Sequence, residues 1–296
     1  MNTLKKILVF ALAVCMVIGL AACGGTKTAQ PQPVEAPKPV ILVVSFGTSY
    51  NDNRELSIGG IESAIANAFP DYEVRRAFTA DTIINILKDR DNIVIDNVKE
   101  AMERLVADGV KEVIIQPTHV MAGYEYDDIV KEVNKYADKF DTFKIGKNLL
   151  ESDADYEQLV KVLAEETKEY IADNAAVAFM GHGTEHTSNA TYEKLQAAFN
   201  AAGYGNYFIG TVEAEPTVDD VIEGLSAGGY GKVTLLPLMI VAGDHANNDM
   251  AGDEEDSWKS VISAAGFDVE CVIKGMGQYA GVQQMIVDHC AATIAE

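Results

Sequence analysis

Cysteine and basic residues are both scarce in this sequence. Four cysteines are present and no two of them have CxxC spacing, so neither a cysteine-based zinc site nor a dithiol redox centre is indicated. Lysine and arginine together number 23 against 45 aspartates and glutamates, which gives a formal net charge of −22. Such a surface repels phosphate backbones, so nucleic acid is not an expected partner.

The apolar run at residues 7–20 is too short to span a bilayer comfortably as a permanent helix. It follows Lys5 and Lys6 and ends in Leu-Ala-Ala-Cys-Gly, which resembles a bacterial lipobox. We therefore interpret residues 1–23 as a lipoprotein signal peptide with Cys23 as the lipidated residue; an uncleaved anchor is the alternative. The mature protein is then expected on the outer face of a bacterial cell membrane, attached through its lipid only.

Proline is also rare, and its distribution marks a linker. Four of the eight prolines lie in or beside residues 24–38, which have almost nothing to bury and are predicted to form an extended tether. The remaining chain is long enough for one large domain or two ordinary ones. A disulfide between Cys271 and Cys290 and two separately buried thiols both fit the sequence.

Short β-branched runs alternate with amphipathic stretches from residue 39 onward, which predicts parallel α/β architecture. Strands are expected at 40–45, 73–78, 112–116, 143–147, 176–180, 207–212, 232–237 and 267–273. Helices are expected between them, for example at 97–107 and 217–227, each followed by glycine.

A weak internal repeat divides this series into two halves. VSFGTSY (44–50) is similar to FMGHGTEH (179–186), and EVIIQPTHVMAGYEYDDI (112–129) is similar to KVTLLPLMIVAGDHANND (232–249). The repeat predicts two similar lobes, 39–150 and 151–296, each with a mainly parallel sheet flanked by helices. Because ligands of such sheets collect at the carboxyl ends of strands, these loops are expected to line a cleft between the lobes.

Histidine is the other rare residue, with five copies, and three of them follow predicted strands: His119, His182 and His245. In the repeat, His182 aligns with Phe46 and His245 aligns with Glu125. The second half has therefore gained an imidazole at each of its two loops. A lone histidine is usually structural, but three at corresponding strand ends favour a functional site.

Glu213, at the end of the intervening strand, completes a set of two histidines and one carboxylate with His182 and His245. Such a set suits Co²⁺, Fe²⁺, Ni²⁺ or Zn²⁺ and leaves coordination positions open for exchange. Glu215 is the rival ligand, because it points to the same face if the strand persists. For His119, an accessory ligand on the opposite lobe and a plain loop residue both remain open.

With these residues, the sequence from 39 to nearly the C-terminus resembles the sirohydrochlorin cobaltochelatases of anaerobic cobalamin biosynthesis, which are class II chelatases. The matching segments are VVSFGTS (43–49), RAFT (76–79), FMGHG (179–183), VE (212–213) and LPLMIVAGDHANNDMAGDEEDSW (236–258). The resemblance implies insertion of Co²⁺ into the tetrapyrrole sirohydrochlorin without nucleotide hydrolysis or an organic cofactor. It assigns metal binding to His182, Glu213 and His245; Fe²⁺ or Ni²⁺ as the metal and a homo-oligomeric state stay open.

Metal insertion releases two pyrrole protons, so the site needs groups that bind a metal and then accept protons. We expect His182 and His245 to do both and Glu213 to act as ligand and electrostatic partner. The ring carboxylates require cations or hydrogen-bond donors. Arg76 is the expected cation, with an ordinary ion pair as the alternative, and Arg54 and Arg75 are further candidates.

Ser45, Thr48 and Ser49, in the first glycine turn, are expected to donate hydrogen bonds to the same carboxylates; capping the following helix is the alternative. The export signal adds a second hypothesis about function, because the pathway that the resemblance implies is cytoplasmic. An exported lipoprotein that carries a tetrapyrrole or metal for uptake would use the same site without turnover. The complete ligand set favours an enzyme, because a carrier of the ring alone needs no metal-exchange ligands.

Overall fold

The computed structural model describes residues 37–296. The signal peptide predicted at residues 1–23, the lipidation site Cys23 and most of the tether at 24–38 lie outside the described residues. No helix in the described part is both long enough and apolar enough to cross a membrane.

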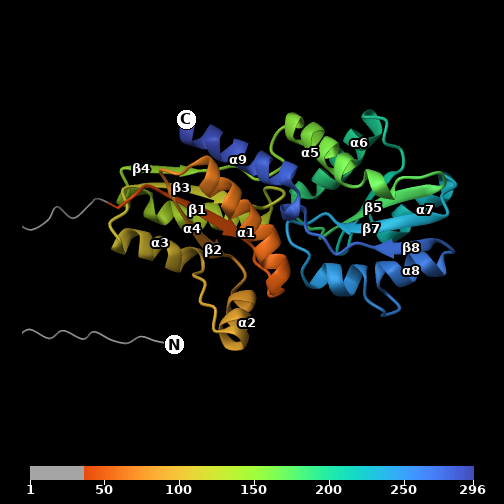
Figure 1. Ribbon diagram of the computed structural model, residues 1–296, viewed down its shortest axis with the longest axis horizontal. Coiled ribbons are helices and arrows are strands. Elements are labelled where there is room, and N and C mark those ends of the chain that lie inside the picture. Colours follow the sequence, from red (N-terminus) through yellow and green to blue (C-terminus); the bar gives the residue numbers. More distant parts are fainter. Residues whose placement is uncertain (1–36) are drawn as a thin grey trace, which may run out of the picture. The chain divides into compact units, whose positions relative to one another are not determined.

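The described chain contains two four-stranded sheets, and every strand pair within them is parallel (Figure 1). The strand order is β2-β1-β3-β4 in the first sheet and β6-β5-β7-β8 in the second, so the two sheets have equivalent topologies. This confirms the predicted fold class of two similar α/β lobes. The strands are β1 (Val40–Ser45), β2 (Glu73–Phe78), β3 (Glu112–Pro117), β4 (Thr142–Ile145), β5 (Ala175–Gly181), β6 (Tyr207–Thr211), β7 (Lys232–Pro237) and β8 (Asp268–Cys271).

Burial explains which strand boundaries the sequence predicts well. All residues of β1 (VILVVS) and of β5 (AAVAFMG) are buried, because a central parallel strand covered on both faces needs apolar side chains on both. The edge strands β4 and β8 have four residues each and are shorter than predicted. Their side chains are exposed or only partly buried, so the apolar pattern does not mark where pairing ends.

Helices connect the strands, and two of them test the predicted boundaries. The helices expected at 97–107 and 217–227 begin one residue later, because Asn97 and Thr217 are N-caps whose side chains accept hydrogen bonds from the third helical N–H. The α-helices are α1 (Asn51–Ala68), α2 (Asp81–Asp91), α3 (Val98–Ala107), α4 (Tyr124–Val133), α5 (Asp153–Glu166), α6 (Ala190–Ala201), α7 (Val218–Ala227), α8 (Trp258–Ala264) and α9 (Ala280–Ala295). Short helical segments are η1 (Asn134–Lys139), η2 (Lys168–Tyr170), η3 (Thr187–Asn189), η4 (Ala246–Met250) and η5 (Met276–Gln278).

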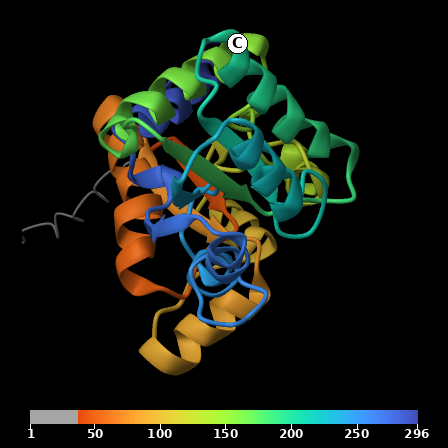
Figure 2. The same ribbon diagram turned by 90° about the vertical axis from the view of Figure 1, so that its right-hand side faces the viewer.

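The C-terminal helix α9 belongs to the second half by sequence but packs on the first. It lies against α1, β3 and β4 and beside α5 (Figure 1 and Figure 2). The Lys144 ammonium on β4 donates a hydrogen bond to the Ile294 carbonyl (2.8 Å), and His289 on α9 is hydrogen-bonded to Asp155 on α5 (2.9 Å). The predicted boundary at residue 150 thus separates the two sheets, while α9 crosses back over it.

One hydrophobic core contains buried side chains of both halves. Ile41 and Val43 of β1 belong to the same cluster as Phe179 of β5 and Val282 and Ile286 of α9. Full burial of a side chain of this size contributes about 1.5–3 kcal/mol. A shared core of such residues fixes the loops at the carboxyl ends of the two sheets relative to one another.

Candidate metal centre

A cavity of about 590 Å³ lies at the carboxyl ends of the strands of both sheets. Its wall takes residues from segments 45–50 and 118–125 of the first half and from 182–185 and 238–245 of the second. These are the loops that follow β1, β3, β5 and β7, where parallel α/β sheets bind their ligands.

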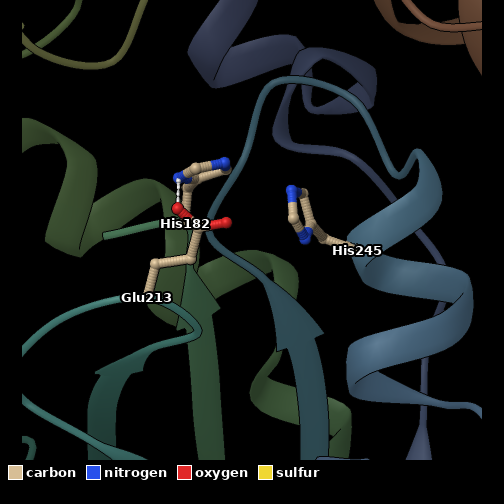
Figure 3. Close-up of side chains that lie close together, drawn as sticks. All are labelled: His182, Glu213 and His245. Atoms are coloured by element: carbon tan, nitrogen blue, oxygen red, sulfur yellow. Dashed lines mark ion pairs between the residues drawn. The ribbon is translucent and has the colours of Figure 1, made fainter. Parts of the chain in front are cut away.

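His182, Glu213 and His245 point toward one another on the second-half wall of this cavity (Figure 3). Each offers one ligand atom, and these atoms all lie within 4.8 Å of one another. The two imidazole centroids are 4.6 Å apart with an interplanar angle of 85°, and His182 Nδ1 lies 3.8 Å from Glu213 Oε2. A divalent cation forms bonds of about 2.0–2.2 Å to nitrogen and oxygen, so small side-chain rotations would bring donors at this spacing onto one ion.

The three side chains remain open to solvent. The side chain of His182 is 48% exposed, that of Glu213 is 56% exposed and that of His245 is 33% exposed. A structural metal site surrounds its ion with four protein ligands, whereas this set supplies three and leaves space on the cavity side. The arrangement suits an ion that arrives and departs.

A glycine turn at the end of β5 positions His182. Gly183 has φ +88°, and a Cβ there would come within 2.8 Å of the Ala214 nitrogen, so the turn requires glycine. The turn brings the Gly183 carbonyl to 2.8 Å from His182 Nδ1. The Glu213 N–H donates a hydrogen bond to the His182 carbonyl (2.9 Å). The backbone itself therefore places the first two members of the set side by side.

His245 is positioned by a different structural element, the π-helical turn η4 that follows it. Such turns are rare and occur frequently at functional sites. The Asn247 side chain donates a hydrogen bond to the Gly243 carbonyl (2.7 Å), and His245 Nδ1 lies 2.6 Å from Asp249 Oδ2. Both imidazoles of the set thus have Nδ1 next to an oxygen that can only accept, so in the neutral rings the free lone pair is on Nε2.

The rival ligand Glu215 does not join the set. Strand β6 ends at Thr211, so the face that Glu215 would share with Glu213 does not continue. The Glu215 carboxyl group is exposed, and the neighbouring Asp220 carboxyl group raises the pKa of Glu215. The condition for Glu215 as a ligand, a strand that continues past Glu213, is therefore not met.

His119 lies in the first-half wall of the cavity and outside the three-residue cluster. Although the residue as a whole is only half-buried, both ring nitrogens are shielded from solvent and have no hydrogen-bond partner among the described residues. Burial lowers the pKa of His119 to about 4, so the ring is neutral near pH 7.

Ser45 and Thr48 line the cavity, as expected of ligand-binding residues, and each is 2% exposed. Ser45 Oγ accepts a hydrogen bond from the Thr118 hydroxyl (2.8 Å), and Thr48 Oγ1 accepts one from the Tyr50 N–H (3.3 Å). Both hydroxyl groups therefore keep their own hydrogen for another acceptor. Neither side chain caps α1, whose N-cap residue is Tyr50.

Arg76 is not part of the cavity wall. Its guanidinium donates two hydrogen bonds to the Glu62 carboxylate on α1, at 2.7 and 2.6 Å. This geometry corrects the expectation that Arg76 reaches a ligand in the cavity; the ordinary ion pair describes its contacts. Arg54 and Arg75 are also held by neighbouring polar groups, and the part of the chain described here contributes no lysine or arginine to the wall.

Two features of the site escaped the sequence analysis. One is Asp249. It follows His245 by four residues, and residues with this spacing are neighbours in a helical turn, so the sequence did contain a signal for the contact. The other is a contact at the rim between the two halves, where His186 Nε2 lies 3.6 Å from Asp127 Oδ2 and the Tyr124 ring packs edge-on against His186. No local pattern reveals this contact, because its partners are far apart in the chain.

The protein has two parallel α/β lobes, and the cavity between them contains an open set of two histidines and one carboxylate. These are features of a class II chelatase. Residues 39–295 match the family model described as Cobalt chelatase (CbiK). The chain belongs to this family.

Named relatives agree with the family model. The chain is 40% identical over 252 residues to the sirohydrochlorin cobaltochelatase of Salmonella typhimurium, covering 85% of this chain and 95% of the relative. It is 30% identical over 275 residues to the sirohydrochlorin cobaltochelatase CbiKC of Nitratidesulfovibrio vulgaris, covering 92% and 96%. The fold is similar to that of the sirohydrochlorin chelatase SirB from Bacillus subtilis subspecies spizizenii in complex with cobalt, with a TM-score of 0.57, 14% identity and coverage of 87% of this chain and 95% of that one.

Proposed function

We propose that this protein inserts Co²⁺ into sirohydrochlorin, the activity named for its two relatives. The observation that carries the proposal is the convergence of His182, Glu213 and His245 on an open cavity in a member of the cobalt chelatase family. Fe²⁺ and Ni²⁺ suit the same donor set, so the metal in the cell depends on supply as well as on ligand type. The proposed reaction uses neither nucleotide hydrolysis nor an organic cofactor.

In this proposal, the Nε2 atoms of His182 and His245 and the Glu213 carboxylate hold Co²⁺ at the cavity wall. The macrocycle occupies the cavity between the two halves, with one face toward the metal. As Co²⁺ forms its bonds to the four ring nitrogens, two pyrrole N–H bonds break and the imidazoles that release the metal accept the two protons. Metal and protons thus exchange places on one set of side chains.

The ring carboxylates have no cation to meet in the described wall. We propose that they accept hydrogen bonds from the hydroxyl groups of Ser45 and Thr48, whose hydrogens are free, and project the remaining charge toward solvent. The apolar side chains Met121, Met239 and Ile240, which also line the cavity, suit contact with the flat faces of the macrocycle.

The test is metallation of sirohydrochlorin by Co²⁺, followed by absorbance, with the wild-type protein and the His182→Ala/His245→Ala double variant. We expect multiple turnovers that the double variant loses, because it lacks both imidazole donors. Arg76→Ala is the control and should keep its turnover, since Arg76 lies outside the cavity. Stoichiometric binding of the ring by the wild type without turnover would contradict the proposal and favour a carrier.

We also propose that the protein is exported and anchored by a lipid on Cys23, on the basis of the apolar run at 7–20 and the small residues before the cysteine. Cys23→Ala should abolish incorporation of labelled fatty acid and reduce the membrane-bound fraction. Unchanged labelling in this variant would rule out the anchor.

A further inference from the structure

The two imidazoles of the centre have unlike partners at Nδ1. His182 Nδ1 lies 2.8 Å from the Gly183 carbonyl, which is a neutral acceptor. His245 Nδ1 lies 2.6 Å from Asp249 Oδ2, which is a carboxylate oxygen. A hydrogen bond to a charged acceptor is about twice as strong as one between neutral groups. The two histidines are therefore held, and polarised, to different extents.

The described side-chain contact of the Asp249 carboxylate is with the His245 ring. Within residues 37–296, no lysine or arginine nitrogen lies within salt-bridge distance of its carboxylate, and the His245 ring is its one ion-pair partner. The neighbouring acidic residues behave differently: Asp244 accepts from the Asn248 amide (2.8 Å), and Asp253 pairs with Lys259 (2.6 Å). Asp249 is thus set apart from an otherwise ordinary acidic loop.

The backbone keeps Asp249 in place. It lies in the π-helical turn η4, whose Met250 is fully buried in the second-half core and whose Ala246 is likewise buried. The Asn247 side chain holds the start of the turn through the Gly243 carbonyl. A carboxylate carried on a turn anchored at both ends can hold an imidazole ring in one orientation.

We infer that Asp249 is a positioning residue that directs Nε2 of His245 at the metal and makes His245 the stronger of the two imidazole donors. The inference rests on the proposed role of His245 as a metal ligand. A carboxylate that accepts the other ring N–H fixes the tautomer of a ligating histidine and increases its donor strength. Co²⁺ should then be held chiefly through His245. His182 should yield first as the metal leaves, because its Nδ1 is hydrogen-bonded to a carbonyl and lies 3.8 Å from the Glu213 carboxylate, beyond hydrogen-bond distance.

The experiment uses the full-length protein, Co²⁺ alone as the probe, and the variants Asp249→Ala and Asp249→Asn. The nitrogen chemical shifts of the His245 ring in the metal-free protein report the tautomer, and the visible absorbance of bound Co²⁺ reports affinity. We expect Asp249→Ala to shift the ring away from the Nδ1–H form and to weaken Co²⁺ binding by about 10- to 100-fold. Asp249→Asn, whose amide oxygen can still accept the Nδ1–H, should fall between Asp249→Ala and wild type.

The matched control is Asp253→Ala, which removes the same charge from the same loop at a side chain that is 97% exposed. It should stay within about twofold of wild type, because exposed ion pairs contribute little. Should Asp249→Ala fail to fold, the tautomer and affinity of Asp249→Asn decide. An unchanged tautomer and an affinity equal to that of Asp253→Ala would overturn the inference.

Single variants His182→Ala and His245→Ala separate this inference from the proposed function. If both bind Co²⁺ as the wild type does, the metal centre itself is wrong. If both lose binding while the Asp249 variants keep it, only the role of Asp249 is wrong. A larger loss for His245→Ala than for His182→Ala supports the inferred difference between the two imidazoles.

Discussion

His119 shows how a single side chain can couple the stability of this protein to pH. Its ring nitrogens are shielded and without a hydrogen-bond partner in the described chain, and burial lowers its pKa from the ordinary 6.5 to about 4. As the pH falls below about 6.5, the unfolded chain binds a proton at this residue, whereas the folded protein does so only near pH 4. Between these values the unfolded state binds more protons, so stability is lost as the pH falls.

We predict that His119→Phe flattens the pH dependence of the free energy of unfolding between pH 6.5 and 4. The wild type should lose at most about 3 kcal/mol more than the variant over this interval, which is the value of the shift at 1.36 kcal/mol per pKa unit. Urea unfolding at several pH values measures it, with His186→Gln at the cavity rim as the control for loss of an imidazole. Parallel curves for wild type and His119→Phe would show that burial of His119 has no such effect.

At the residue scale, residue types at strand ends can be recognised from the sequence, whereas contacts with a distant partner cannot. The histidines after β5 and β7 are noticeable because the aligned positions of the first half are Phe46 and Glu125. Arg76 has the chemistry for a carboxylate but faces Glu62 of α1, and that neighbour is set by tertiary packing. For Glu215 the sequence left the question open, because the end of β6 at Thr211 decides which way its side chain points.

At the scale of elements, the turn between β5 and α6 controls the geometry of the centre. Gly183 and Gly203 have nearly the same φ, +88° and +85°. A Cβ at Gly203 would meet nothing within 4 Å, whereas one at Gly183 would collide with the Ala214 nitrogen and the Thr211 side chain. Alanine substitutions at the two glycines therefore separate the free-energy cost of a positive φ from the effect of crowding on the metal centre.

Gly203→Ala should lower the free energy of unfolding by about 1 kcal/mol and leave Co²⁺ binding unchanged, because only backbone strain is added. Gly183→Ala should cost more and should also weaken Co²⁺ binding, because the crowded turn must move the carbonyl that holds His182. Urea unfolding and Co²⁺ titration of both variants measure these effects. Equal Co²⁺ affinities for the two variants would contradict the role assigned to the turn.

The whole molecule presents an electrostatic conflict, because a chain of net charge −22 is proposed to bind a ring with many carboxylates. The cavity wall includes Glu125, Glu185, Glu213 and Asp244, and its described part has no lysine or arginine. Long-range repulsion of the ring and attraction of the metal should therefore both operate. Salt screens each of them over about 10 Å at 0.1 M ionic strength.

We predict opposite salt dependences for the two substrates. Raising the ionic strength from about 0.02 to about 0.2 M should speed association of sirohydrochlorin severalfold, since repulsion is screened, and should weaken the binding of Co²⁺, since attraction is screened. Stopped-flow absorbance measures the association rate of sirohydrochlorin, and titration measures the affinity for Co²⁺. Each measurement serves as the control for the other. Slower ring association at high salt would reveal a cationic contact that the described wall lacks.

The sequence by itself determined the alternation of strands and helices, the repeat that makes two lobes, and the three loops that carry His182, Glu213 and His245. These features are local, since they follow from apolar periodicity, glycine turns and residue types at strand ends. Only the tertiary structure decided which groups face the cavity. In the folded protein, Arg76 pairs with Glu62 of α1 and α9 packs on the first half, because each of these contacts depends on packing between segments that are far apart in the chain.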